Sequence, residues 1–439
     1  MIVLENKILQ LINYHKTGKT VGITSVCSAN YYVIKAAIIN AKKNNQILLI
    51  ESTSNQVDQF GGYTGLTPAQ FKESVFILAN QLNFSEENII LGGDHLGPNR
   101  WQNDVSSSAV RKAQDQISAY VTAGFTKIHL DASMKCSDDG VQDKPLAPEI
   151  IAERNAILCK SSEAAIYKSG SDVDLPVYII GTDVPLPGGA KEHHTDIRIT
   201  KPEEVEETIR LTEKAFKKYE LQEAWERVIG IVVQPGVEFG DSEVFDYDGK
   251  KSAPLVKLIE NYPSLVYEAH STDYQKKELL RQMVEDHFAI LKVGPWLTYA
   301  FREAVFALAV IEKETLSNKK RIFLSNLLEI LDQRMLELPK YWEKYYTFAE
   351  EDNKLKRKFS YSDRIRYYWS DKKVEESLGR LLNNLTENKI PLTLISQYLP
   401  EEYKTIREGI ISENPEELIL HKISSVLEIY NYATSGGVN

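Results

Sequence analysis

Eight apolar segments, each followed by polar residues, recur over the first 295 residues and constrain the possible folds of the chain. They cover residues 21–27, 47–50, 89–102, 127–133, 177–189, 228–240, 265–275 and 288–295. Stretches with helical periodicity separate them, and strands that alternate with helices pair in parallel through right-handed crossovers. Eight such units are what a (β/α)8 TIM-like barrel requires. We therefore expect this α/β barrel over residues 1–305, with a helical C-terminal region packed on it over residues 306–439.

A doubly wound open sheet is the alternative architecture. Its edge strands would be expected to carry charged residues, whereas the first and last apolar segments of this chain are equally apolar. The N-terminal stretch also has apolar residues at helical spacing: Leu4, Ile8, Leu11 and Ile12. This spacing predicts a helix that covers the bottom of the barrel.

The composition excludes several classes of function. The formal net charge is −10 and the pI is near 5.5, which argues against broad nucleic-acid binding. No apolar stretch approaches the roughly 20 residues that cross a bilayer, and the N-terminus lacks the pattern of a signal peptide. Three cysteines without a CxxC spacing are typical of a reducing compartment. We expect a cytoplasmic protein that binds neither nucleic acid nor membranes. The sequence leaves the oligomeric state open, and a homo-oligomer is one possibility.

Polar residues after the apolar segments predict a site at the mouth of the barrel, where enzymes of this architecture place their chemistry. Two glycines end one apolar run immediately before Asp94 and His95. A turn with incidental charge would explain a single pair of this kind. The pattern recurs, however, because Asp131 and Glu268 also lie in the polar ends of apolar runs. We therefore predict Asp94, Asp131 and Glu268 as catalytic residues.

Other polar residues near the ends of the predicted strands are candidates for substrate binding: Ser25, Glu51, Asn55, Gln56, Asp183 and Lys292. In the C-terminal region, residues 361–369 read YSDRIRYYW and alternate Arg364 and Arg366 with aromatic residues. Such a strip could clamp a phosphate or a carboxylate, which adds both arginines to the substrate-binding candidates. A helix with a buried aromatic face is the alternative interpretation of this strip.

Two of these polar residues allow a second interpretation. Lys292 could form a Schiff base, but an ion pair with Glu268 or Asp131 is the simpler expectation. His129 lies on an apolar strand, where a hydrogen-bonded core histidine is more common than a catalytic or metal-binding one.

Longer motifs give the chain a resemblance to a known family. They are GGYTGLTP, LGGDHLGPNRWQ, KIHLDASM, QPGVEF, YEAHSTDYQ, HFAILKVGP, SDRIRYYW and ISQYLP. Together they resemble the Z-type, non-catalytic subunit of bacterial tagatose-1,6-bisphosphate aldolase over residues 21–432. One departure is Asp183, where the family usually carries Glu.

The resemblance implies a TIM-like barrel that supports the activity and stability of a separate, catalytic class II aldolase subunit in galactitol and amino-sugar catabolism. Some relatives are instead metal-dependent 4-epimerases of ketohexoses or uronate sugars. Older descriptions of such proteins as tagatose-6-phosphate kinases find no support, because the sequence contains no GxxxxGK[ST] phosphate loop.

Comparison with class II aldolases also implies a divalent metal, with zinc as the expected ion. Those enzymes hold it through histidines at strand ends, and His95 and His270 resemble two of them. The third histidine is replaced by Gln234, with Glu238 as an oxygen ligand nearby. The predicted metal ligands are therefore His95, His270 and Glu238, with Gln234 as the alternative to Glu238. The phosphate loop after the strand-seven histidine is missing, since the chain reads STDYQKK there.

Three functions follow: a partner of an aldolase subunit, a ketose 4-epimerase, and an independent class II aldolase. The missing phosphate loop argues against the third. Retention of Asp94, His95, Glu238 and His270 favours a working site, whereas the full-length resemblance favours the partner role. We expect the partner role first, with a small sugar or sugar phosphate as the ligand.

Overall fold

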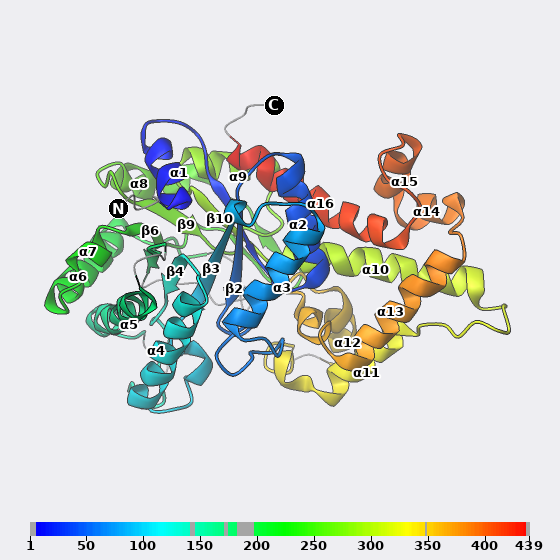
Figure 1. Cartoon of the computed structure of the whole chain (residues 1–439), viewed down its shortest axis with the longest axis horizontal. Coiled ribbons are helices and arrows are strands. Elements are labelled where there is room, and N and C mark those ends of the chain that lie inside the picture. The colour runs from blue at the N-terminus through cyan, green and yellow to red at the C-terminus, as the bar shows by residue number, and fades with distance from the viewer. Residues whose placement is uncertain (1–5, 141–144, 171–173, 182–196, 347–348, 436–439) are drawn as a thin grey trace.

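The computed structural model describes residues 6–140, 145–170, 174–181, 197–346 and 349–435. Eight parallel strands close into a barrel in the order β1-β10-β9-β6-β5-β4-β3-β2 (Figure 1). These strands are β1 Ile23–Cys27, β2 Leu48–Thr53, β3 Ile89–Leu96, β4 Lys127–Leu130, β5 Val177–Ile180, β6 Val228–Val232, β9 Val266–Ala269 and β10 Ile290–Val293. Each lies within or overlaps one of the apolar segments. The predicted (β/α)8 fold is confirmed.

A layer of helices surrounds the barrel. The helices that follow successive strands are α2 Tyr31–Lys43, α3 Pro68–Gln81, α4 Ser106–Thr122, α5 Pro148–Ser169, α6 Pro202–Lys218, the short α7 Gln222–Trp225, α8 Gly249–Ile259 and α9 Lys277–Glu285. The last helix of the chain, α16 Pro415–Thr434, packs against α2, α9 and β1. It thereby fills the place in the ring that a helix directly after β10 would take.

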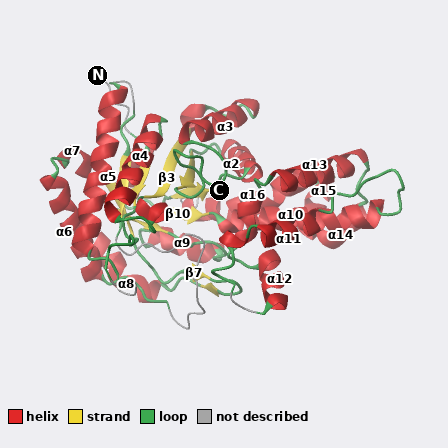
Figure 2. Ribbon diagram, turned by 90° about the horizontal axis from the view of Figure 1, so that it is seen from below, coloured by secondary structure: helices red, strands yellow, loops and turns green. Residues whose placement is uncertain are grey.

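The remaining helices extend to one side of the barrel (Figures 1 and 2). They are α10 Pro295–Leu316, α11 Leu327–Glu337, α12 Glu350–Phe359, α13 Lys372–Glu387, α14 Leu392–Tyr398 and α15 Pro400–Arg407, with the 3-10 turns η3 Pro339–Tyr341 and η4 Arg364–Tyr368. Helix α10 begins at the end of β10 and runs across the boundary expected at residues 305 and 306. Within the described ranges, no helix combines the length and apolar character needed to cross a membrane.

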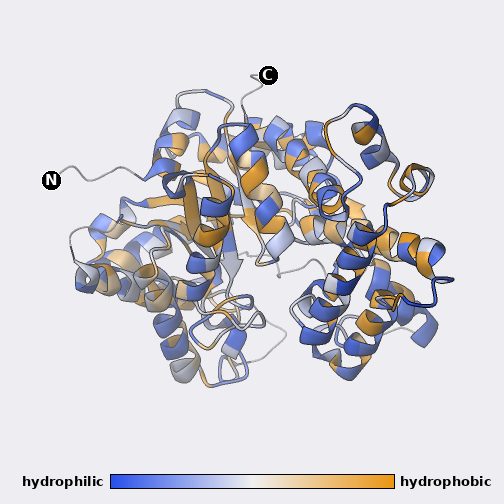
Figure 3. Ribbon diagram, turned by 45° about the vertical axis from the view of Figure 1, so that its right-hand side comes forward, coloured by the Kyte–Doolittle hydropathy of each residue, from blue (hydrophilic) through white to orange (hydrophobic). Residues whose placement is uncertain are grey.

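The barrel has an apolar lower interior. Ile23, Leu49 and Ile90 are buried there, and they pack against Ile8 and Ile12 of α1 Lys7–Lys16. A second apolar layer lies between the strands and the surrounding helices, and Figure 3 shows hydrophilic residues on the outer faces of those helices. Apolar packing therefore closes the bottom of the barrel, and the polar residues of the strands gather at the other end.

A histidine pair below the barrel makes the stability of the fold depend on pH. His15 Nε2 lies 2.9 Å from His287 Nδ1, and burial lowers the pKa of both rings, that of His287 to about 4. Because the unfolded chain takes up protons near pH 6.5 and the folded chain resists them until about pH 4, stability falls as the pH drops through this window. The ring of His287 is partly exposed, so we expect a loss of about 1 to 2 kcal/mol.

The variant His287→Asn should flatten this pH dependence. Asn suits the left-handed backbone of His287, which has φ 68°. Thermal unfolding followed from pH 8 to pH 4 gives the comparison. A variant curve that stays parallel to that of the native chain would show that the histidine pair does not cause the loss.

Candidate active site

A bulge in β3 places two consecutive polar residues at the barrel mouth. Asp94 and His95 lie within the last residues of β3, where the pairing with β4 shifts between Gly93 and Leu96. His95 has φ 49°, in the left-handed region that non-glycine residues rarely adopt. In a regular strand these neighbours would face opposite sides. Here both line the same cavity. The sequence predicted them just beyond the strand, and the bulge accounts for the difference.

Two lysines and three carboxylates form a buried charge network inside the upper barrel. Lys127 Nζ lies 2.6 Å from both Glu51 Oε1 and Glu268 Oε2. Lys292 Nζ lies 2.7 Å from Asp94 Oδ1, 2.8 Å from Glu51 Oε2 and 3.1 Å from Glu268 Oε1. All five side chains are almost completely buried. Each buried charge therefore has partners of opposite sign, which offsets its loss of hydration.

Gly92 makes room for this network. A Cβ atom at residue 92 would lie 2.7 Å from Glu51 Cγ on the neighbouring strand. Any larger side chain would displace Glu51, which contacts both lysines. Gly92, the first of the two glycines before Asp94 and His95, is thus a packing requirement of the network.

Three histidine rings lie directly above these charges. The ring centroids of His95, His129 and His270 are 4.9 to 5.2 Å apart. Each ring has its own carboxylate: His95 Nδ1 is 2.8 Å from Asp131, His129 Nδ1 is 3.0 Å from Asp94, and His270 Nε2 is 3.0 Å from Glu268. The carboxylates thus fix the orientation of all three rings.

Burial and charge set the protonation states of these groups. Burial alone would raise the pKa of Asp94, but His95 and Lys292 outweigh it and hold this pKa well below the usual range. Burial likewise opposes the ammonium form of Lys292, yet Asp94, Glu268 and Glu51 keep its pKa well above the usual range. Burial and the charge of Lys292 lower the pKa of His270 to about 3. At neutral pH, Asp94 is therefore ionised, Lys292 is an ammonium group and His270 is neutral.

The cluster has the properties of a metal site. One ligand atom each from Asp94, His129, Glu268 and His270 lies within 4.8 Å of the others. His129 Nε2 is buried and has no hydrogen-bond partner in the described part of the chain. Imidazole nitrogens and carboxylate oxygens are ligands of zinc and related divalent ions. These four residues could therefore hold a metal ion.

This set differs from the ligands predicted from the sequence. His270 belongs to both, and His95 lies beside the cluster with its Nε2 3.7 Å from Asp94. Glu238 belongs to β7 Glu238–Phe239, which pairs with β8 Val244–Phe245 in a hairpin, and is not part of the four-residue group. Burial raises the pKa of Glu238 to about 7. Gln234 accepts a hydrogen bond from the backbone of Gly236 instead.

His129 is the residue that sequence reasoning undervalued. It is fully buried on β4, as a core histidine would be, but its ring points at Asp94 and His270. The signal was present in the spacing of His129 and Asp131, which lie two residues apart and therefore share a strand face. Asp131 accepts hydrogen bonds from His95 and Ser133.

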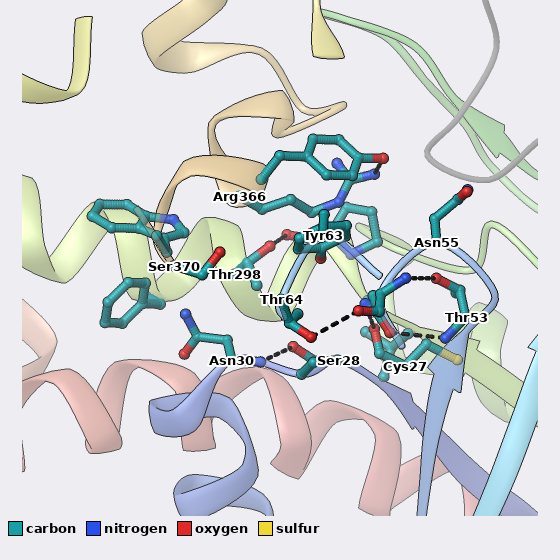
Figure 4. A pocket seen from close by; sticks show the side chains of 18 of the residues that line it. Cys27, Ser28, Asn30, Thr53, Asn55, Tyr63, Thr64, Thr298, Arg366 and Ser370 are labelled. Atoms are coloured by element: carbon teal, nitrogen blue, oxygen red, sulfur yellow. Dashed lines mark hydrogen bonds between the residues drawn. The ribbon is translucent and has the colours of Figure 1, made fainter. Parts of the chain in front are cut away.

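A cavity of about 530 Å³ opens above the cluster, with Asp94, His95, His270 and Lys292 in its floor. Its walls come from both parts of the chain. Cys27, Ser28, Thr53 and Asn55 come from the ends of β1 and β2, Thr298 comes from the start of α10, and Arg366 and Ser370 come from the C-terminal region (Figure 4). The C-terminal region is therefore part of this cavity.

The predicted substrate-binding residues do not all line this cavity. Asn55, Gln56, Lys292 and Arg366 line the cavity. Ser25 and Glu51 lie below it and are hydrogen-bonded to each other at 2.7 Å. Arg364 lines a neighbouring cavity, and Asp183 lies outside the described residues. Four residues outside the predicted set also line the main cavity: Cys27, Tyr63, Thr298 and Trp369. Cys27 ends the first apolar segment and Trp369 ends the basic-aromatic strip 361–369, whereas the sequence around Thr298 gave no signal for this role.

The chain is similar to several proteins of known structure. The crystal structure of a probable tagatose 6 phosphate kinase from Sinorhizobium meliloti 1021 is 42% identical, with a TM-score of 0.84 over 94% of this chain and 100% of that chain. A fructose-bisphosphate aldolase from Campylobacter jejuni is 14% identical, with a TM-score of 0.47 over 87% of this chain and 94% of that chain. The fructuronate-tagaturonate epimerase UxaE from Cohnella laeviribosi is 14% identical, with a TM-score of 0.46 over 94% of this chain and 82% of that chain.

The family model described as "D-tagatose-1,6-bisphosphate aldolase subunit GatZ/KbaZ-like" matches residues 8–435, nearly the whole chain. The relative from Sinorhizobium meliloti is similar over almost the same extent. The chain therefore belongs to the GatZ/KbaZ-like family.

Proposed function

We propose that this chain is itself an enzyme, a metal-dependent epimerase that inverts C4 of a ketohexose or of its phosphate. One observation carries the proposal: a complete, buried set of acids, histidines and a lysine forms the floor of a cavity of sugar size. Burying ionisable groups costs free energy, so a cluster of them in a cleft is typical of a site that carries out chemistry. Asp94, His129, Glu268 and His270 are the proposed metal ligands.

Inversion at C4 of a ketose cannot proceed by simple removal of the hydrogen on C4, because C4 is not next to the carbonyl at C2 and its hydrogen is not acidic. Cleavage and re-formation of the C3–C4 bond is a route that needs no oxidant. Ionised Asp94 accepts the proton of the C4 hydroxyl, and the C3–C4 bond cleaves to give an aldehyde and a three-carbon enediolate. The aldehyde rotates so that its opposite face meets C3. C3 then attacks this face, the C3–C4 bond forms again, and the proton returns to the oxygen on C4. No oxidant or reductant is consumed.

The residues of the site match the demands of this sequence. The ammonium group of Lys292 lies beside Asp94 and balances the negative charge that develops on the enediolate oxygens. Asp131 orients His95, whose ring is available to exchange protons with the sugar hydroxyls. Asp94, His129, Glu268 and His270 would hold a divalent ion, which would supply Lewis acidity to the sugar carbonyl. A Schiff base on Lys292 does not fit, because the buried carboxylates hold this lysine as a charged ammonium group.

Support of a separate, catalytic class II aldolase subunit is the second candidate function. The observation that favours it is the family match over residues 8–435, because the family is described by an aldolase subunit. Phosphoryl transfer is not proposed, although the relative from Sinorhizobium meliloti is called a probable kinase, because the sequence has no GxxxxGK[ST] loop.

One assay separates the two candidates. The purified chain is stripped with a chelator, reloaded with zinc, manganese or cobalt, and incubated with fructose, tagatose and their 6-phosphates. We expect interconversion that depends on the metal, and loss of bound metal in the double variant His129→Ala, His270→Ala.

The same preparations are then added to a class II tagatose-bisphosphate aldolase subunit. Stimulation of that subunit together with no interconversion under any metal would replace the epimerase by the supporting role. The variant Asp104→Asn is the matched control, because Asp104 pairs with Lys112 on the outside of the barrel.

A further inference from the structure

A second cavity of about 310 Å³ lies beside the catalytic one, where the barrel mouth meets the C-terminal region. Arg100 from the 3-10 turn η2 Pro98–Trp101 lines it on the barrel side, and Lys340 and Arg364 line it on the other. Asn55, Tyr63 and Tyr367 line both cavities. A ligand that reacts in the first cavity could therefore extend a polar end into the second.

Two of the three cations in this second cavity lack a carboxylate partner. Arg100 pairs with the buried Asp58. In contrast, neither Lys340 nor Arg364 forms an ion pair with any carboxylate of the described ranges. Arg364 is only 3% exposed, and its Nε has no hydrogen-bond partner within those ranges. A buried guanidinium group without a counter-ion is costly, so its surroundings favour an anion.

The aromatic residues of this cavity fix the position of its cations. The guanidinium of Arg364 lies 3.1 Å from the ring centre of Tyr345 and donates a hydrogen bond to the carbonyl oxygen of Tyr341. The ring of Tyr341 stacks on Tyr367 with centroids 4.8 Å apart and planes 9° from parallel. Tyr63 meets the edge of this stack at 4.9 Å from Tyr367. Arg364 is thus held in place before any ligand arrives.

We propose that this second cavity is the phosphate subsite of the enzyme and holds the terminal phosphate of a ketose phosphate whose carbonyl end lies over the catalytic cluster. The two positive charges without partners match the charge of a phosphate monoester near neutral pH, and the guanidinium of Arg364 and the ammonium group of Lys340 are the donors for its oxygens. This inference rests on the proposed function for the sugar end of the ligand. In this proposal, the second cavity takes the role of the phosphate loop, which the sequence lacks after β9.

Equilibrium binding to the metal-free protein tests the subsite without any turnover. Calorimetric titrations use inorganic phosphate, fructose 6-phosphate, fructose and galacturonate in the presence of a chelator. We expect fructose 6-phosphate to bind at least 10-fold more tightly than fructose. The affinity for galacturonate should exceed that for fructose by a much smaller factor. The variants Lys340→Gln and Arg364→Gln should each weaken binding of the phosphate ester by about 10-fold and leave binding of fructose unchanged.

Lys344→Gln is the matched control, because Lys344 is exposed four residues from Lys340 and does not line the cavity. Lys340 is also exposed, so its variant decides the question even if Arg364→Gln fails to fold. Equal affinity for fructose and its phosphate, a preference for galacturonate, or an equal effect of Lys340→Gln and Lys344→Gln would overturn the subsite. Absence of epimerase activity with this binding pattern intact would overturn only the proposed reaction.

Discussion

Replacing Lys127 by Met is expected to lower the free energy of unfolding by about 3 to 5 kcal/mol, because the buried carboxylates of Glu51 and Glu268 then share Lys292 as their one remaining cation among the described residues. Lys127 is completely buried and lies 2.6 Å from both Glu51 and Glu268. Met has a similar length and no charge, so the change creates little empty space. The loss is therefore electrostatic.

Thermal and urea unfolding of the metal-free protein at pH 8 measure this loss. The double variant Lys127→Met, Glu51→Gln should recover part of it, because one of the two repelling carboxylates is then neutral. Lys354→Met, at an exposed position of α12, is the matched control and should change stability by no more than about 0.5 kcal/mol. A Lys127→Met protein as stable as the control would mean that the network does not depend on this lysine.

The fold could be predicted because its strands are marked by composition alone. Most residues of the eight parallel strands are buried, so most of these strands read as short apolar runs, although β4 reads KIHL. The position of α16 could not be predicted in the same way. Its helical periodicity shows that one face is buried, but not that the partner of this face is the gap between α2 and α9. This gap exists because α10, which follows β10, extends to one side of the barrel and does not pack between α2 and α9.

The site shows the same division. Closure of the barrel brings Asp94, Asp131, Glu268 and His270 to one mouth, as strand-end positions imply. The sequence could not show the β7 and β8 hairpin, because two-residue strands carry no periodic signal. Glu238 belongs to this hairpin and is not among the four residues that could hold a metal ion together. Lys127 also gave no signal, since a fully buried lysine is rare and its partners lie on two other strands.

Asp94→Asn is expected to reduce metal-dependent interconversion by 100- to 10,000-fold, the usual range for loss of a general base, without unfolding the barrel. The carboxylate contacts Lys292 at 2.7 Å and His129 at 3.0 Å, and it lines the main cavity. Asn has the same shape but is not basic and is a weaker metal ligand. Lys292 keeps Glu51 and Glu268 as partners, so the protein should fold normally.

The assay must separate loss of chemistry from loss of metal, because Asp94 is both the proposed base and a proposed ligand. Turnover is therefore measured at saturating zinc, with bound metal determined in the same samples. The other three proposed ligands, His129, Glu268 and His270, should still hold the ion in the Asp94→Asn protein. A variant that retains the metal but has lost turnover therefore identifies Asp94 as the base. Turnover within tenfold of the native chain would instead assign the proton transfer to another residue. His95 is then the first candidate, because its ring contacts His270 at the cavity floor and Asp131 holds it in place.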